Sequence, residues 1–108
     1  MQRLRAFRIR WSLCGLLQIH HIVPRCVHAT LAPPAAIPVD DPDNLMFMPT
    51  RSGARRMRLR ADRLLHDGGH PAYNAYVRER AQNATNLSLL MDELRAGLRR
   101  ADPDLPWP

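Results

Sequence analysis

The stretch that decides the fold is Gln18-Ile19-His20-His21-Ile22-Val23, followed directly by Pro24. β-branched residues are frequent in it, and proline cannot continue the hydrogen bonding of a strand, so we predict a strand that ends at residue 23. Neighbouring side chains on a strand point to opposite faces. His20 and His21 therefore cannot bind one ion in the same way, and we expect one to bind a metal and the other to transfer a proton.

A loop and a second strand should follow. Residues 25–43 contain four prolines, which predict a loop. Residues 44–48 are then rich in apolar side chains and are closed by Pro49, so we predict a short strand there. Asn44 stands at its start, where the amide could hydrogen-bond an active-site imidazole or bind a metal.

Helical periodicity begins after this strand pair. Apolar residues spaced at i, i+4, i+7 and i+8 from Met57 predict a helix over residues 55–65 that stops at Gly68-Gly69. Pro71 suits the first position of a further helix with His70 at its N-cap. We expect a last helix to start near Thr85 or Asn86, because residues 83–86 are poor helix formers.

Both ends of the chain lie outside these elements. Apolar and polar residues alternate from Phe7 to Leu13, which predicts a strand in the N-terminal segment. The last seven residues should form a loose tail. We divide the chain into a basic N-terminal extension containing that candidate strand, a central domain, a C-terminal helix and the tail. These parts span residues 1–17, 18–82, 83–101 and 102–108.

A second histidine pair lies near the middle of the chain. His66 and His70 are four residues apart, which would place both rings on one face of a helix, a spacing common among metal ligands. Gly68-Gly69 between them favours instead a turn leading into a helix. The two rings are expected to be close in space in either geometry.

Composition limits the kind of protein. The chain has 108 residues and a formal charge of +6 from 16 arginines and 10 acidic residues. That length fits one small domain and excludes a large enzyme scaffold such as a barrel. Apolar runs are too short for a membrane helix or a secretory signal, so we expect a soluble chain without either. Cys14 and Cys26 have no CxxC partner and should be reduced thiols.

The positive charge is uneven along the chain. Residues 1–39 contain five arginines and no carboxylate, residues 40–65 six arginines and four aspartates, and residues 66–108 five arginines and six acids. We therefore expect the first two thirds to meet a polyanionic partner. Arginine-biased codon usage would give the same composition without nucleic acid being involved.

Three ordered blocks resemble a known family. They are His20-His21-Ile22-Val23-Pro24, then Asp43-Asn44-Leu45-Met46-Phe47-Met48-Pro49, and then His66-Asp67-Gly68-Gly69-His70-Pro71-Ala72-Tyr73-Asn74. Together they look like the signatures of the AHH branch of the HNH/endonuclease VII nucleases, and the likeness covers about residues 18–82. It implies an α+β fold with a small ββα-metal finger core, a short strand pair, flanking helices and a helical C-terminus.

The resemblance also implies residue roles. His20 would be a metal ligand, His21 the general base, and Asn44 the residue that orients the base or supports the metal. His66 and His70 would supply the remaining ligands. The sequence departs from the pattern at Ile19, where the branch name expects alanine. The arginine-rich helix predicted between the strands and His66 leaves open which of His66 and His70 is the main ligand.

These observations predict an HNH-type, metal-dependent endonuclease that hydrolyses DNA, with RNA as the other candidate substrate and little sequence preference. One divalent ion is expected, chosen among Mg, Mn, Zn and Ni. Four arginines flank the finger and would bind the nucleic-acid backbone: Arg25, Arg51, Arg55 and Arg56.

The resemblance suggests a biological setting as well. Such domains often form bacterial toxins, which act in the cytoplasm, are delivered as effectors and are neutralised by an immunity protein. The alternative function is a non-catalytic, zinc-stabilised nucleic-acid-binding module in which the histidines only fold the chain.

Overall fold

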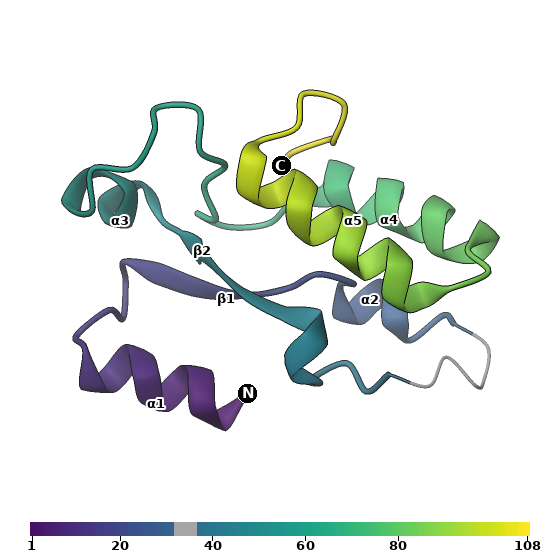
Figure 1. Ribbon diagram of the computed structural model, residues 1–108, viewed down its shortest axis with the longest axis horizontal. Coiled ribbons are helices and arrows are strands. Elements are labelled where there is room, and N and C mark those ends of the chain that lie inside the picture. The colour runs from purple at the N-terminus through teal and green to yellow at the C-terminus, as the bar shows by residue number, and fades with distance from the viewer. Residues whose placement is uncertain (32–36) are drawn as a thin grey trace.

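The structure is a computed structural model that describes residues 1–31 and 37–108. It is an α+β fold, as predicted, with one two-stranded sheet surrounded by helices (Figure 1). In chain order the elements are α1 (Gln2–Arg10), β1 (Leu17–His21), α2 (Arg25–His28), the 3-10 helix η1 (Pro42–Asn44), β2 (Leu45–Pro49), α3 (Arg51–Arg56), α4 (Pro71–Asn83) and α5 (Leu87–Arg100).

The two strands pair in antiparallel register and give the sheet two distinct faces. Leu17 pairs with Pro49, and His21 pairs with Leu45 at the other end. One face carries Leu17, Ile19, His21, Leu45, Phe47 and Pro49, and the other carries Gln18, His20, Met46 and Met48. The register thus places the neighbouring histidines on opposite faces, as the strand pattern predicted.

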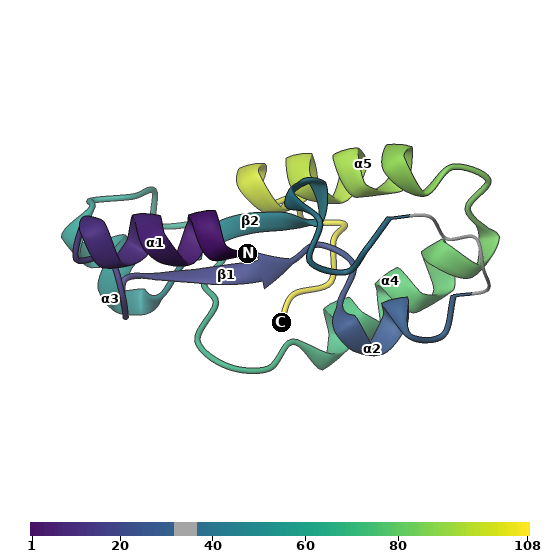
Figure 2. The same cartoon turned by 90° about the horizontal axis from the view of Figure 1, so that it is seen from below.

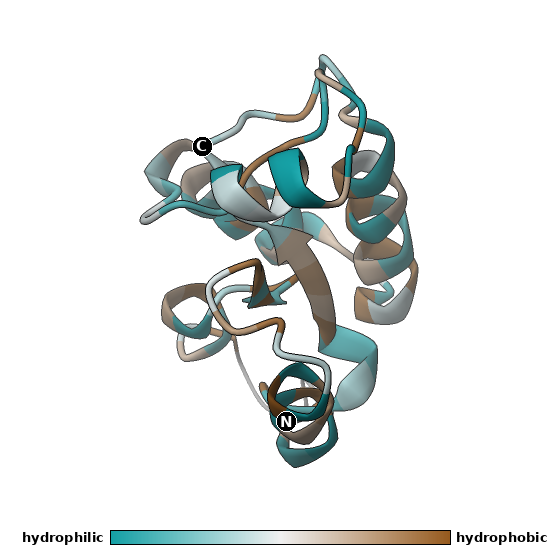
Figure 3. Ribbon diagram, turned by 90° about the vertical axis from the view of Figure 1, so that its left-hand side faces the viewer, coloured by the Kyte–Doolittle hydropathy of each residue, from teal (hydrophilic) through white to brown (hydrophobic). Residues whose placement is uncertain are grey.

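Helices cover the two faces differently. Figure 1 shows α4 and α5 on one side of the strand pair and α1 on the other. Viewed from below, α1 lies in front of the strands (Figure 2). Figure 3 shows the apolar β2 strand between these layers. The core lies on the His20 side, where Met48, Tyr73, Val77 and Leu98 are fully buried.

Helices α4 and α5 start where the sequence predicted. Pro71 occupies the first turn of α4, and His70 is its N-cap residue. The side chain of Asn86 accepts a hydrogen bond from the Leu89 amide and so caps α5. Leu90, Met91, Leu94 and Leu98 form the buried stripe of α5.

The predicted helix over residues 55–65 is wrong. The Thr50 hydroxyl accepts a hydrogen bond from the Gly53 amide, so α3 starts at Arg51, before the apolar period begins. The helix ends at Arg56, and Arg58 has a left-handed backbone conformation with φ of 53°. Leu64 still packs against the core, but it does so from a segment without regular secondary structure.

The strand predicted between Phe7 and Leu13 is also wrong, because the structure has helix α1 there. Phe7 packs on Phe47 of β2 with ring centroids 5.6 Å apart, and the Arg8 guanidinium donates a hydrogen bond to the Leu17 carbonyl. One side of the helix is therefore attached to the sheet, although none of its residues is fully buried. Alternation over so few residues did not distinguish this helix from a strand.

The segment expected to be a loose tail is packed. Leu105 is buried in the core, the Trp107 indole N–H donates to the Leu65 carbonyl at 2.9 Å, and the Pro108 carbonyl accepts from the Ala72 amide at 3.2 Å. The predicted proline loop holds one helical turn, α2, which the sequence analysis missed.

Of the four prolines in that loop, Pro33 and Pro34 lie outside the described residues. No helix in the described part of the chain is both long and apolar enough to cross a membrane.

Gly53 gives the first testable prediction. A Cβ atom at this position would lie 1.8 Å from the Leu16 carbonyl oxygen, because α3 starts directly against the beginning of β1. Gly53→Ala should lower the free energy of unfolding by about 2 kcal/mol or more, measured by urea denaturation. Gly69→Ala, where a Cβ meets nothing within 4 Å, is the matched control. Equal stability of the two variants would contradict this packing.

Candidate functional site

Three histidines from distant parts of the chain meet on the core side of the sheet. One ring nitrogen each from His20, His66 and His70 can be chosen so that all lie within 4.8 Å of one another. The ring centroids are 5.0 Å apart for His20 and His70, and 5.2 Å apart for the other two pairs. The structure thus brings together all three residues that the sequence suggested as ligands. Both His66 and His70 belong to this group.

Local contacts position the two histidines that lie outside the sheet. The His66 amide donates to the Pro49 carbonyl at 2.8 Å, which ties the segment before α4 to the end of β2. The His70 ring bonds through Nδ1 to the Asn74 amide oxygen at 2.7 Å, one helical turn further along. Because that oxygen can only accept, Nδ1 carries the proton and Nε2 of His70 is left as the free ligand atom.

His20 is the buried member of the cluster, with 1% of its surface exposed. Neither of its ring nitrogens has a hydrogen-bond partner among the residues that the structure describes. Burial, followed by the nearby charges of His70, His66 and His21, lowers the pKa of His20 to about 2. The ring is therefore neutral, which is the form that binds metals.

The cluster fits a divalent ion. A buried polar group without a partner costs about 1–3 kcal/mol, and coordination of one His20 nitrogen would remove that cost for the nitrogen that binds. Three neutral imidazoles are a familiar donor set for such an ion. Cys14 and Cys26 are exposed free thiols and do not belong to this group.

Trp107 covers the histidines and was missed by the sequence analysis. Its ring stacks on His70 with centroids 5.0 Å apart and an interplanar angle of 24°, and it lies 5.5 Å from His20. Tyr73 closes another side at 5.2 Å from His20, and its hydroxyl donates to the Ile22 carbonyl. A tryptophan beside the apolar Leu105 was the available signal that the last residues pack.

His21 faces the other side of the sheet and binds a carboxylate. Its Nε2 lies 2.8 Å from Oδ1 of Asp40, and Arg25 approaches the same oxygen at 3.3 Å. The hydrogen bond from His21, with a further contribution from the Arg25 charge, holds the pKa of Asp40 below its usual value. An ionised carboxylate only accepts, so Nε2 carries the proton and Nδ1 is the free acceptor. Asp40 had not been assigned a role from the sequence.

Asn44 is buried and bonds only to the backbone in the described structure. Its amide oxygen accepts from the Val23 amide at 2.7 Å, and its amide nitrogen donates to the carbonyls of Val23 and Val39. The direct bond to an imidazole that its position suggested is therefore not formed. Asn44 instead holds the chain just after the histidine pair against the residue before Asp40, so its influence on His21 is indirect.

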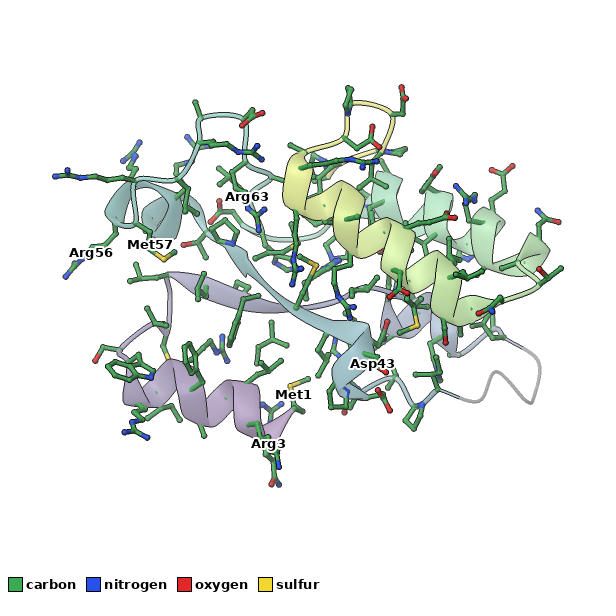
Figure 4. The ribbon with its side chains drawn as sticks, in the orientation of Figure 1. Met1, Arg3, Asp43, Arg56, Met57 and Arg63 are labelled. Atoms are coloured by element: carbon green, nitrogen blue, oxygen red, sulfur yellow. The ribbon has the colours of Figure 1, made fainter. Side chains whose placement is uncertain are left out.

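The four arginines expected to bind the nucleic-acid backbone have different surroundings. Arg25 pairs with Asp40, as described above. Arg51 lines a pocket of about 310 Å³ together with Arg63 and Trp107. Arg55 and Arg56 are exposed on α3, and Figure 4 shows the Arg56 side chain extending away from the body of the molecule.

The buried His20 predicts a pH dependence of stability. In the metal-free protein His20 stays neutral in the fold, while the unfolded chain takes up a proton below about pH 6.5. The contribution of the neutral ring to the free energy of unfolding is complete above that pH and is lost as the pH falls. Protonation of His20 in the unfolded chain alone should therefore lower the free energy of unfolding by about 2 kcal/mol between pH 7 and pH 5. Urea denaturation with a chelator measures this change.

His20→Leu is the control for that experiment, because it removes the titrating ring. The leucine variant should show a weaker dependence over the same pH range. Equal dependence in the two proteins would contradict the burial of a neutral His20.

The position of Trp107 allows metal binding to be observed directly. The chain has two tryptophans, so Trp11→Phe leaves Trp107 as the only indole. Its ring lies between 5.0 and 6.0 Å from those of the three histidines, so Cu²⁺ or Ni²⁺ bound there should quench its fluorescence. The Trp107→Phe variant, which retains Trp11, should show little change. Quenching of equal size in both variants would place the ion elsewhere.

Comparison with known proteins agrees with this geometry. Residues 16–101 match AHH, a nuclease family of the HNH/ENDO VII superfamily with a conserved AHH motif. The match begins just before β1 and extends beyond α4 to include α5. No curated protein and no solved structure shows significant similarity. Because the family match covers most of the chain, including all three cluster histidines, the protein belongs to the AHH family of nucleases.

Proposed function

We propose that the chain is a metal-dependent endonuclease that hydrolyses phosphodiester bonds of DNA. RNA is the alternative substrate. Membership of a nuclease family makes nucleic acid its substrate class. The observation that carries the finer proposal is the division between neighbouring histidines. His20 joins a three-histidine donor cluster, while His21 on the opposite face is bonded to a carboxylate.

His21 acts as the general base in this proposal. Its Nε2–H donates to Asp40, which leaves the Nδ1 lone pair to accept the proton of a water molecule. The water oxygen then bonds to phosphorus as the bond to the leaving oxygen breaks. Asp40 holds the ring in the required tautomer and stabilises the imidazolium that forms, and Arg25 in turn holds Asp40.

His20, His66 and His70 would hold the ion in this proposal. A divalent ion there would stabilise the negative charge that develops on the phosphoryl and leaving oxygens. Nitrogen ligands favour Zn or Ni in affinity, whereas phosphoryl transfer more often uses Mg or Mn, so all four are candidates. Arg51 lines the pocket beside Trp107, where its guanidinium can bind a phosphate.

The biological part of the proposal is a bacterial toxin domain. It would be delivered as an effector, act in the cytoplasm of the target cell and be neutralised by an immunity protein. The support is the resemblance of the histidine blocks to such domains. Little sequence preference is expected, because the assigned contacts are arginines aimed at the backbone.

Removal of the base should separate chemistry from metal binding. His21→Ala should lower kcat for plasmid nicking by about 10²- to 10⁴-fold, while the Trp107 quenching by Ni²⁺ stays unchanged. His20→Ala should instead lose both cleavage and quenching. Asp40→Asn keeps the His21 imidazole but removes the charged carboxylate that accepts its hydrogen bond. This variant should therefore lose less kcat than His21→Ala.

His28→Ala is the matched control, because the His28 ring bonds to the Ile37 carbonyl and belongs to neither group. Full activity of His21→Ala would contradict the assignment of the base. A wild-type protein that binds metal and nucleic acid but never cuts DNA or RNA with Mg, Mn, Ni or Zn would instead be the zinc-stabilised binding module. Growth arrest on expression of wild type, and its absence with His21→Ala, tests the toxin role.

A further inference from the structure

Helix α1 presents positive charge that no acidic group on the helix balances. It contains four arginines in nine residues and no carboxylate. Arg3, Arg5 and Arg10 are exposed, and none of them forms an ion pair within the described residues. Exposed arginines on the other side of the molecule can behave differently, since Arg80 pairs with Glu93 at 2.8 Å. The charge of α1 is therefore available to a partner.

The helix is fixed beside the face that carries His21. Phe7 packs on Phe47, which shares its face with His21 through the strand register. Arg8 adds the hydrogen bond to the Leu17 carbonyl at 3.2 Å. Figure 1 shows that α1 runs antiparallel to β1, so its first turn points toward the end of β1 where His21 lies. Figure 4 shows Arg3 on that first turn, directed away from the sheet.

Apolar side chains accompany the arginines on this exposed surface. Ile9 is 70% exposed and Trp11 is 59% exposed, and the Arg10 guanidinium lies 5.5 Å from the centre of the Trp11 ring. Arginines next to an aromatic ring are suited to a chain of phosphates and sugars, which offers both negative charge and apolar surface.

We propose that the exposed face of α1 binds the phosphate backbone of the DNA substrate and guides it to the His21 side of the sheet. The inference rests on the proposed endonuclease function and extends it to a surface outside residues 16–101, the part that matches the family. The partner is identified by charge complementarity: an acid-free helix with three exposed guanidinium groups, none of them in an ion pair among the described residues, suits a polyanion.

Binding in the absence of cleavage tests the proposal. In a His21→Ala background, the combined Arg3→Gln, Arg5→Gln and Arg10→Gln variant is titrated with a fluorescein-labelled DNA duplex at several salt concentrations. Loss of three phosphate contacts should make the negative slope of log K, the association constant, against log[salt] shallower by up to about 2.7, since each contact contributes about 0.9. In the active background the same changes should raise KM far more than they lower kcat.

A second triple variant controls for net charge. Arg78→Gln, Arg80→Gln and Arg100→Gln remove three exposed arginines of α4 and α5 and change the charge by the same amount. This control should keep a slope within about 0.9 of the parent. Trp11→Ala should lower the affinity for the duplex several-fold without changing the slope. Circular dichroism melting confirms that each variant remains folded.

The outcomes separate this inference from the proposed function. If the α1 variant keeps the parent slope, or loses no more than the control, α1 does not bind DNA, although cleavage by the wild type would still support the endonuclease. If the α1 variant loses binding to an RNA hairpin but not to the duplex, the assignment to DNA is overturned. If the parent neither binds nor cuts DNA or RNA, the proposed function itself fails.

Discussion

The site depends on one constraint, the alternation of side chains along β1. Because neighbouring residues of a strand face opposite ways, His20 enters the dry core side while His21 remains on the side of α1. A slip of one residue in the pairing with β2 would exchange their environments. Several contacts oppose such a slip: Asn44 binds the backbone of Val23, and Thr50 binds the carbonyls of Gly15 and Leu16 at the other end. The register of the short sheet is therefore as important to the chemistry as the histidines.

Much of this arrangement could be predicted from the sequence, because it is determined by local signals. Both strands were placed within one or two residues of their observed bounds, although β1 ends at His21, before Pro24, and β2 includes Pro49. The start of α4 followed from Pro71, and that of α5 from Asn86. The closeness of His66 and His70 followed from their four-residue spacing, whereas the meeting of His20 with this pair followed only from the family resemblance. The domain boundaries and the chemical roles of the site residues stay predictions.

The features that were missed depend on contacts between distant segments. Alternation in residues 7–13 suggested a strand, but the Phe7 contact with Phe47 is compatible with a helix that is attached along one side. The last residues contain three prolines and suggested a tail, whereas Trp107 gains a stack on His70 and a bond to Leu65. Asp40 lies in a loop, and nothing within the loop indicates that its partner is His21, nineteen residues before it.

The spacing of the cluster along the chain has a consequence for folding. His20 and His66 are separated by the loop, β2 and α3, so an ion bound by both would close a long loop in any state that retains it. Such a link restricts the unfolded ensemble as a disulfide does. The entropic cost of closing the loop rises only slowly with loop length, by about 0.6 kcal/mol for each doubling. Insertions between β1 and η1 would therefore weaken the link very little. Unlike a disulfide, the link would open with a chelator and form under reducing conditions.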